Sequence, residues 1–373
     1  MKQLFTLKTK SPNRFKLSPV LWACLMVIVL MTACSKNDDN SVTTPTGPYA
    51  NGFFILNEGW YGHENGSVNF YQYGADTLQL SAFAAANNGN SPTTSTATLE
   101  DGAIIGNDLF LISTAGGPIT VADAATLQQV GQITMDGSSF RAIAAIDANT
   151  AVVSSGSDIY TIDLNSLTIN TTPVYAGNYI KKLLKVGDYL LASSNNGVDI
   201  IKISDWSLVK HFDGPTEGYV TTKDGTVYGA GGKLLVSVNA ASQDTTQIAL
   251  NQAIWVDDYA YHAPSLVASS KENAIFYIAK PTSGYSGNEI YKYTKGDAGS
   301  LNAPFITLPT GETFYSTGLG YDKQNNQIVT WSITGYSETD SNFLRFYDAT
   351  TGDLVKSIEY KHIYFPGNIV FYN

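Results

Sequence analysis

From residue 52 onward, short apolar runs rich in β-branched and aromatic residues alternate with polar turns that often contain glycine. Runs of this length and composition are typical of β-strands that pack on at least one face. Each is followed by a second run that closes in a polar turn, as at residues 161–167 and 346–352. The first run of such a pair occurs seven times, at residues 53–57, 109–114, 151–155, 189–194, 226–230, 275–280 and 328–333.

The closing turns can be aligned on one position per repeat, at Tyr73, Asp123, Asp163, Ser204, Asn239, Thr294 and Asp348. These positions recur about every 46 residues, which is the length of one four-stranded propeller blade. Solenoid β-helix coils are much shorter, and helical repeats would show an apolar period of 3.6 residues. The spacing therefore predicts an all-β fold, a seven-bladed β-propeller.

An innermost strand is predicted before six of the seven runs, at residues 103–105, 142–146, 183–186, 219–222, 266–269 and 318–321. The run at 53–57 has no such strand before it, whereas residues 367–373 read as an inner strand with no blade after them. We therefore expect the C-terminal strand to pair with the first blade. This pairing closes the ring and removes sheet edges that would otherwise be exposed.

The composition agrees with a single large β domain over residues 51–373. Glycine (33) and tyrosine (23) are abundant and only 14% of the side chains are charged. A disordered chain, a coiled coil and a protein with many membrane spans are all excluded by this composition.

Residues 1–33 are predicted to be a lipoprotein signal peptide. Five basic residues between Lys2 and Lys16 precede an apolar run at residues 19–33, which is short for a permanent membrane anchor. Leu30-Met-Thr-Ala33 before Cys34 resembles the bacterial lipoprotein box, so Cys34 is the expected lipidation site. Cys24 fits the box less well, and an ordinary unpaired thiol is the alternative for Cys34.

The next segment, residues 34–50, is predicted to be a flexible acidic tether because it is too polar to pack. Asp38 and Asp39, close behind the lipidated cysteine, resemble the signal by which Bacteroidetes send lipoproteins to the outer face of the outer membrane. We therefore expect an outer-membrane, lipid-anchored protein exposed at the cell surface. A merely solvated linker is the alternative.

Removing residues 1–33 takes away five of the 22 basic residues and none of the 32 acidic ones, so the net charge changes from −10 to −15. A surface this acidic makes nucleic acid an improbable partner. With Cys34 lipidated, no thiol is left to form a disulfide, and stability must come from core burial and strand pairing.

In a propeller, the loops from second to third strands and the loops from blade to blade emerge on the same face, where ligands usually bind. Aromatic rings provide large contact area at low entropic cost, and neighbouring polar groups can orient a ligand. Packing between blades is the alternative for any single aromatic residue. The candidate ligand-binding residues in these loops are Trp60, Tyr61, His63, Asn65, Asn88, Tyr179, Trp255, Asp257, Tyr259, Tyr261, His262, Tyr285, Tyr315 and Tyr336.

Catalytic motifs are absent from the sequence. It contains no HExxH, Walker-type loop or GxSxG, and its four histidines have no metal-ligand spacing, although His63 and His262 could meet on one face. We therefore expect a binding protein with no cofactor and no metal site. A propeller lactonase, with Glu, Asn and Asp around a central calcium, is the enzymatic alternative.

Three segments carry a family resemblance: FILNEG at 54–59, SVNFY at 67–71 and FPGNIVF at 365–371. Together they resemble the YncE-like seven-bladed propeller lipoproteins of Bacteroidetes, over essentially all of residues 52–373. That family includes BtuG, which captures cobalamin (vitamin B12) and passes it to the TonB-dependent transporter BtuB. The resemblance implies a surface protein that binds a scarce, bulky nutrient, with cobalamin as the leading candidate and a BtuB-like transporter as partner. A glycan or protein ligand, as in an adhesin or a polysaccharide-uptake accessory, is the alternative.

Overall fold

The computed structural model describes residues 46–214, 218–256, 265–282, 284, 286–337, 339–361 and 365–372. The predicted signal peptide and Cys34 lie outside these residues. So do five of the candidate binding residues, namely Asp257, Tyr259, Tyr261, His262 and Tyr285.

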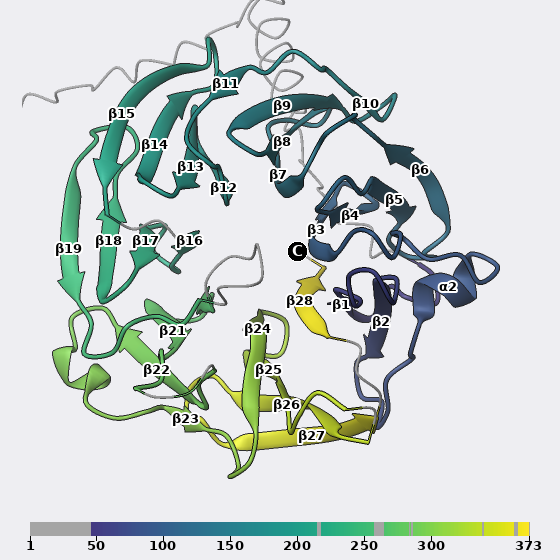
Figure 1. Ribbon diagram of the computed structural model, residues 1–373. Coiled ribbons are helices and arrows are strands. Elements are labelled where there is room, and N and C mark those ends of the chain that lie inside the picture. Colours follow the sequence, from purple (N-terminus) through teal and green to yellow (C-terminus); the bar gives the residue numbers. More distant parts are fainter. Residues whose placement is uncertain are drawn as a thin grey trace, which may run out of the picture. The chain divides into compact units, whose positions relative to one another are not determined.

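Seven antiparallel sheets form a ring in the described part of the chain, with strands succeeding one another from the centre outward (Figure 1). The predicted seven-bladed β-propeller is confirmed. The second blade contains β3 (Leu99–Ile105), β4 (Asp108–Ser113), β5 (Ile119–Asp123) and β6 (Gln129–Ile133). The third contains β7 (Phe140–Ala145), β8 (Thr150–Ser155), β9 (Asp158–Asp163), β10 (Thr168–Ile169) and β11 (Tyr175–Ala176).

The next two blades follow the same order. The fourth contains β12 (Leu183–Val186), β13 (Tyr189–Ser194), β14 (Gly197–Lys202) and β15 (Ser207–Asp213). The fifth contains β16 (Gly218–Thr221), β17 (Val227–Gly231), β18 (Leu234–Val238) and β19 (Thr245–Ala249).

The last two complete blades precede the closing strand. The sixth contains β20 (Leu266–Ala268), β21 (Ala274–Ile278), β22 (Glu289–Thr294) and β23 (Ile306–Thr307), with the short helix η1 (Ala298–Leu301) between the last two. The seventh contains β24 (Thr313–Asp322), β25 (Gln327–Ile333), β26 (Ser341–Asp348) and β27 (Leu354–Lys361).

Both ends of the chain form the first blade. Its strands are β28 (Pro366–Phe371), β1 (Gly52–Asn57) and β2 (Ser67–Gln72), in the spatial order β28-β1-β2. Ile55 lies opposite Ile369 in the antiparallel pair, and the rings of Phe53 and Phe371 lie 4.9 Å apart. The predicted closure by the C-terminal strand is thus confirmed, including its position at the centre of the ring (Figure 1).

The first blade departs from the four-strand pattern. A single bridge between Phe70 and Gln79 takes the place of a fourth strand, and the chain then enters the short helix α2 (Ala82–Ala86). Phe83 of this helix is fully buried and packs on the apolar core of the first two blades. The helix therefore covers apolar surface that an outer strand would otherwise cover.

Apolar layers between neighbouring blades hold the ring together. Phe276 and Ile278 of the sixth blade pack with Phe314 and Ile328 of the seventh, all fully buried. Burying such side chains contributes roughly 1.5–3 kcal/mol each to the free energy of unfolding.

No described helix is long and apolar enough to span a membrane.

The polar turns between third and fourth strands share one construction in the second, third, fifth and seventh blades. Asp123 Oδ1 accepts hydrogen bonds from the backbone N–H groups of Ala125 and Thr126 at 3.1 and 2.8 Å, and Leu127 then adopts φ 56°. Asp348 makes the same turn before Gly352, at φ 81°. The aligned acidic positions therefore fix the hairpins structurally, because an Asx turn satisfies backbone donors that the strands leave free.

Candidate functional site

The strand order assigns every loop to one of two faces. The side that carries the loops between second and third strands, such as 58–66 and 334–340, and the loops between blades is here named the rim face. The opposite side, named the turn face, carries the turns between first and second strands and those between third and fourth strands. Most of the described candidate residues belong to the rim face.

The first-blade loop at 58–66 presents the most exposed aromatic side chains. Trp60 is 55% exposed and Tyr61 is 58% exposed. The backbone of this loop is ordered by its own hydrogen bonds, from Trp60 N to Glu64 O at 3.1 Å and from His63 N to Trp60 O at 2.8 Å. Gly59 has φ 78° with backbone atoms of residues 64–66 closely packed around it, so a side chain there would disrupt the loop.

His63 stacks against Trp60, with the ring centroids 4.3 Å apart and the planes inclined by 32°. The structure therefore brings together three of the predicted binding residues, Trp60, Tyr61 and His63, on one short loop. Asn65 lies on the same loop and, with His63 and Ser91, lines a shallow cavity of about 430 Å³. The loop thus combines an apolar ring surface with polar groups at its side.

The loops of the seventh blade meet the first blade on this face. The phenol of Tyr315 donates a hydrogen bond to Glu58 Oε2 at 3.1 Å, and its ring lies 6.3 Å from that of Tyr336 and 5.7 Å from that of Phe365. Tyr336 is 56% exposed. Tyr315 and Tyr336, predicted from different loops, are therefore neighbours, and Glu58 connects them to the Trp60 loop. Sequence reasoning did not select Glu58, although it is the first residue of that loop.

Tyr179 belongs to a second part of the rim face, between the third and fourth blades. The guanidinium carbon of Arg141 lies 3.6 Å from the centre of the Tyr179 ring. The backbone N–H of Tyr179 donates a hydrogen bond to Ser157 Oγ at 3.2 Å. Tyr179 adopts φ 51°, and Arg141 is buried. A cation held over an aromatic face stabilises the local arrangement. No pattern in the sequence singles out Arg141.

Two predicted residues lie elsewhere. Trp255 is only 2% exposed and packs in the core between the sixth and seventh blades, where its backbone N–H donates to Ile278 O at 2.8 Å. Its indole therefore fills the core and does not form part of the exposed rim surface. Asn88 follows the end of α2, next to Asn87, whose side chain donates to Leu127 O in a turn of the opposite face.

An acidic and basic network lies where the third and fourth blades meet. Asp199 accepts a hydrogen bond from the Tyr175 phenol at 2.9 Å, and its Oδ1 lies 2.6 Å from His211 Nδ1. The hydrogen bond with Asp199 raises the pKa of His211 above its ordinary value. Burial, with the hydrogen bond to Asp199, raises the pKa of Tyr175. These groups join β11 and β15 to the buried strand β14.

Within the described residues, no group of three or more His, Cys, Asp or Glu side chains is placed to hold a metal ion. The rim face offers stacking surfaces at Trp60 and Tyr61, with hydrogen-bonding groups beside them. This chemistry suits non-covalent binding of a ligand with flat apolar and polar parts.

Comparison with known proteins places the fold among described propellers. A family model described as a domain of unknown function, DUF5074, matches residues 51–372. No curated protein is matched by the sequence.

Among solved structures, a quinonprotein alcohol dehydrogenase-like protein from Bacteroides thetaiotaomicron is similar, with a TM-score of 0.72 at 18% identity over 87% of this chain and 78% of that one. The dihydro-heme d1 dehydrogenase NirN has a TM-score of 0.50 at 13% identity, over 83% and 73% of the two chains. An extracellular domain from B. thetaiotaomicron, assigned to a one-component system, has a TM-score of 0.54 at 13% identity, over 81% of this chain and 41% of that one. At these identities the likeness establishes the fold alone.

Proposed function

The chain belongs to the DUF5074 family, and we propose that it is a cell-surface lipoprotein that binds a bulky nutrient on its rim face. The observation that supports this proposal is the group of exposed rings on adjoining loops of the first and seventh blades, namely Trp60, Tyr61 and Tyr336. Exposed apolar surface gathered on neighbouring loops often marks an interaction site.

Cobalamin is the ligand that we propose. Its corrin ring is large and flat, and its edge carries amide groups, so it requires both stacking surfaces and hydrogen-bonding partners. Trp60 and Tyr61 supply the former, and His63 and Asn65 supply polar groups beside them. Binding of this kind needs no protein ligand to the cobalt. The likeness of the sequence to YncE-like propellers, which include BtuG, points to the same nutrient.

Attachment to the membrane gives the binding face its role in uptake. We propose that a lipid on Cys34 and the polar segment at 34–50 hold the propeller close to a TonB-dependent transporter of the BtuB type. A tether of this length raises the effective concentration of the captured nutrient at the transporter without any new contact.

Titration calorimetry of residues 46–373 with cyanocobalamin tests the proposal. These residues contain all seven sheets and the closing strand pair. We expect saturable binding of one cyanocobalamin per protein. The absence of heat and of any change in the cobalamin spectrum up to about 0.5 mM would reject cobalamin as the ligand.

A glycan is the second candidate, because an indole as exposed as that of Trp60 also stacks well on a sugar ring. A panel of oligosaccharides tested under the same conditions separates the two ligands. Binding to a glycan that Trp60→Ala abolishes, together with no response to cyanocobalamin, would favour a polysaccharide-uptake accessory.

A further inference from the structure

A second cavity, of about 610 Å³, lies against the inner strands β16, β20, β24 and β28. It takes in Thr221 and Thr222 at the end of β16, Ser269 and Ser270 after β20, and Lys323 after β24. All of these positions belong to turns between first and second strands. The cavity therefore opens toward the turn face, opposite to the exposed rings of the rim face.

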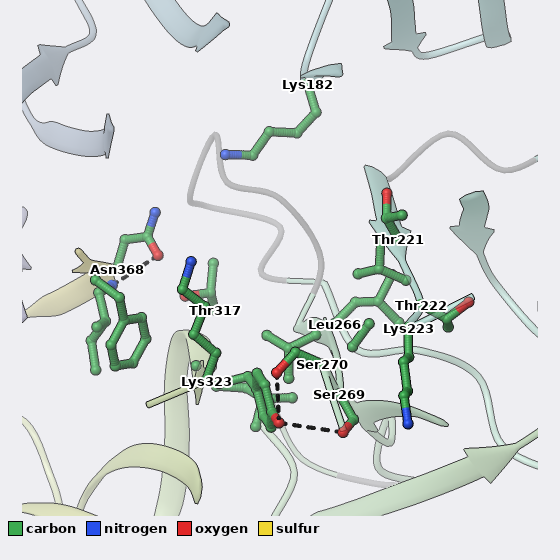
Figure 2. Close-up of a pocket in the computed structure, with 18 residues that line it drawn as sticks. Lys182, Thr221, Thr222, Lys223, Leu266, Ser269, Ser270, Thr317, Lys323 and Asn368 are labelled. Atoms are coloured by element: carbon green, nitrogen blue, oxygen red, sulfur yellow. Dashed lines mark hydrogen bonds between the residues drawn. The ribbon is translucent and has the colours of Figure 1, made fainter. Parts of the chain in front are cut away.

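Among the described residues that line this cavity, the charged ones are Lys182, Lys223 and Lys323, and none is acidic. This is unexpected in a chain with 32 acidic and 22 basic residues. Figure 2 shows the side chains of Lys182, Lys323 and Asn368 extending toward the same open space, whereas the amino group of Lys223 lies at its margin.

Lys182 is already neutralised at the deep end. Its Nζ lies 2.6 Å from Asp101 Oδ2, and Asn368 Nδ2 donates to the other oxygen of that carboxylate at 2.9 Å. One carboxylate thus joins the chain at β3, β12 and β28. Lys182 and Asn368 of this network line the deep end of the cavity, which leaves Lys323 and Lys223 as the lining lysines that can meet a ligand.

The three turns at the mouth repeat one pattern, a lysine next to an acidic residue. The pairs are Lys223-Asp224, Lys271-Glu272 and Asp322-Lys323. Each acidic side chain is engaged within the protein. Asp224 binds Lys295 and Glu272 binds Lys292, both at 2.7 Å, while Asp322 accepts hydrogen bonds from the backbone N–H groups of residues 324 and 325.

The adjacent lysines have no such partner. Among the described residues, the side chains of Lys223, Lys271 and Lys323 make no ion pair. The corresponding turns of the third and fourth blades carry Asp147 and Asp188, and in the second blade Asp108 directly follows the turn. Among the described turns between first and second strands, lysines therefore occur in those of the fifth, sixth and seventh blades, around the cavity.

The turns are held close to one another by direct contacts between blades. Asp224 N donates to Asn273 Oδ1 at 2.9 Å, which links the fifth blade to the sixth. The Tyr321 hydroxyl lies 3.3 Å from Ser269 Oγ and 3.4 Å from Ser270 Oγ, which links the sixth blade to the seventh. The lysines are thus carried on an ordered frame.

The remaining walls combine hydroxyl groups with apolar side chains, including Leu266, Leu319, Ile369 and Phe371. Anionic oxygens are recognised by ammonium groups and hydroxyl donors, and apolar walls favour a ligand with a hydrocarbon body. We propose that this cavity binds a small organic anion through its carboxylate or phosphate oxygens. The site is distinct from the rim face and does not depend on what binds there.

The test uses two probes of similar size, phthalate for carboxylates and phenyl phosphate for phosphate, with benzyl alcohol as the neutral counterpart. Calorimetry of residues 46–373 is expected to show saturable binding of at least one anion in the millimolar range or tighter and none of benzyl alcohol. Preference for phthalate assigns a carboxylate ligand, and preference for phenyl phosphate assigns a phosphate ligand.

The double variant Lys223→Gln/Lys323→Gln is expected to bind the preferred anion with an affinity lower by about tenfold or more, because two charge-assisted contacts are lost. Lys323→Arg in the otherwise unchanged protein keeps the charge and should retain binding. Lys210→Gln, on the outer strand β15, is the matched control and should leave affinity unchanged. No saturable binding of either anion up to about 10 mM, or equal affinity in the double variant and the wild type, would overturn the proposal.

Discussion

Tyr315 of the seventh blade donates a hydrogen bond to Glu58 of the first blade over 3.1 Å. Glu58 is only 7% exposed, and its backbone N–H also donates to Phe365 O at 2.9 Å. These contacts add a second connection between the ends of the ring, on the rim side of the strand pair β1–β28. Closure of the ring and the arrangement of the exposed aromatic loops are therefore linked through one carboxylate.

Removing the phenol hydroxyl in Tyr315→Phe should lower the free energy of unfolding by about 1–3 kcal/mol, because a buried carboxylate loses a hydrogen bond. Urea denaturation measures this change. Tyr61→Phe, at a more exposed ring of the same face, is the matched control and should change stability by less than about 0.5 kcal/mol. Equal effects of the two substitutions would contradict a special role for the Glu58 contact.

Closure of the ring predicts a strong effect at Ile369, which is buried opposite Ile55. Ile369→Ala should cost about 2–4 kcal/mol of the free energy of unfolding, through lost burial and an unfilled cavity. Leu354→Ala, on the exposed face of the outer strand β27, serves as the control and should cost little. If denaturation showed the two variants to be equally stable, the last strand would not be what closes the ring.

A buried ion pair in the seventh blade gives a third prediction. Arg345 Nη2 donates to Glu312 Oε1 at 2.6 Å, Nη1 contacts the other oxygen, and Ser332 Oγ donates to the same carboxylate at 2.7 Å. Glu312→Gln leaves the guanidinium without its counter-charge and should destabilise the protein by about 3–5 kcal/mol.

The double variant Glu312→Met/Arg345→Met tests whether that cost comes from the stranded charge. We expect it to be more stable than Glu312→Gln, because both charges are then absent from the core. A double variant that is less stable than Glu312→Gln in urea denaturation would argue that the pair itself makes a large net contribution.

The contact between His211 and Asp199 predicts a pH dependence. Its hydrogen bond to Asp199 Oδ1 raises the pKa of His211 above the ordinary value of 6.5. Because the folded-state pKa is the higher one, the stabilisation is fully present below pH 6.5 and is lost as the pH rises through the folded-state pKa.

Unfolding of the wild type and of His211→Gln should be compared at about pH 5.5 and about pH 8.5. We expect the stability advantage of the wild type to be larger at the lower pH. An advantage that stays constant between the two, or that grows with pH, would show that the imidazolium does not stabilise the fold.

The sequence predicted the blades well because their determinants are local. Apolar alternation sets the strands, and an Asx turn at positions such as Asp123 and Asp348 ends several of the hairpins, so both are visible within a few residues. The pairing of 53–57 with the C-terminal strand was also predictable, since it is the arrangement that leaves each terminal segment with a partner.

The site was less predictable because it depends on how distant loops meet. The register of β24 shifts between Phe314 and Leu319, and this irregularity accompanies the position of Tyr315 beside Glu58, 257 residues away in sequence. Trp255 is a residue type that often contacts ligands, yet its side chain is buried between the sixth and seventh blades. Lysines of three separate turns likewise gather at one cavity only in the folded ring.

The affinity of Trp60→Ala for cyanocobalamin tests the central claim, that the rim face binds the ligand, most directly. Calorimetry should show a loss of about tenfold or more relative to the wild type, because a stacking surface is removed from an otherwise ordered loop. Leu208→Ala, an equally exposed apolar residue on the outer strand β15, should bind as the wild type does. Unchanged affinity in Trp60→Ala would contradict the account and place the ligand away from this face.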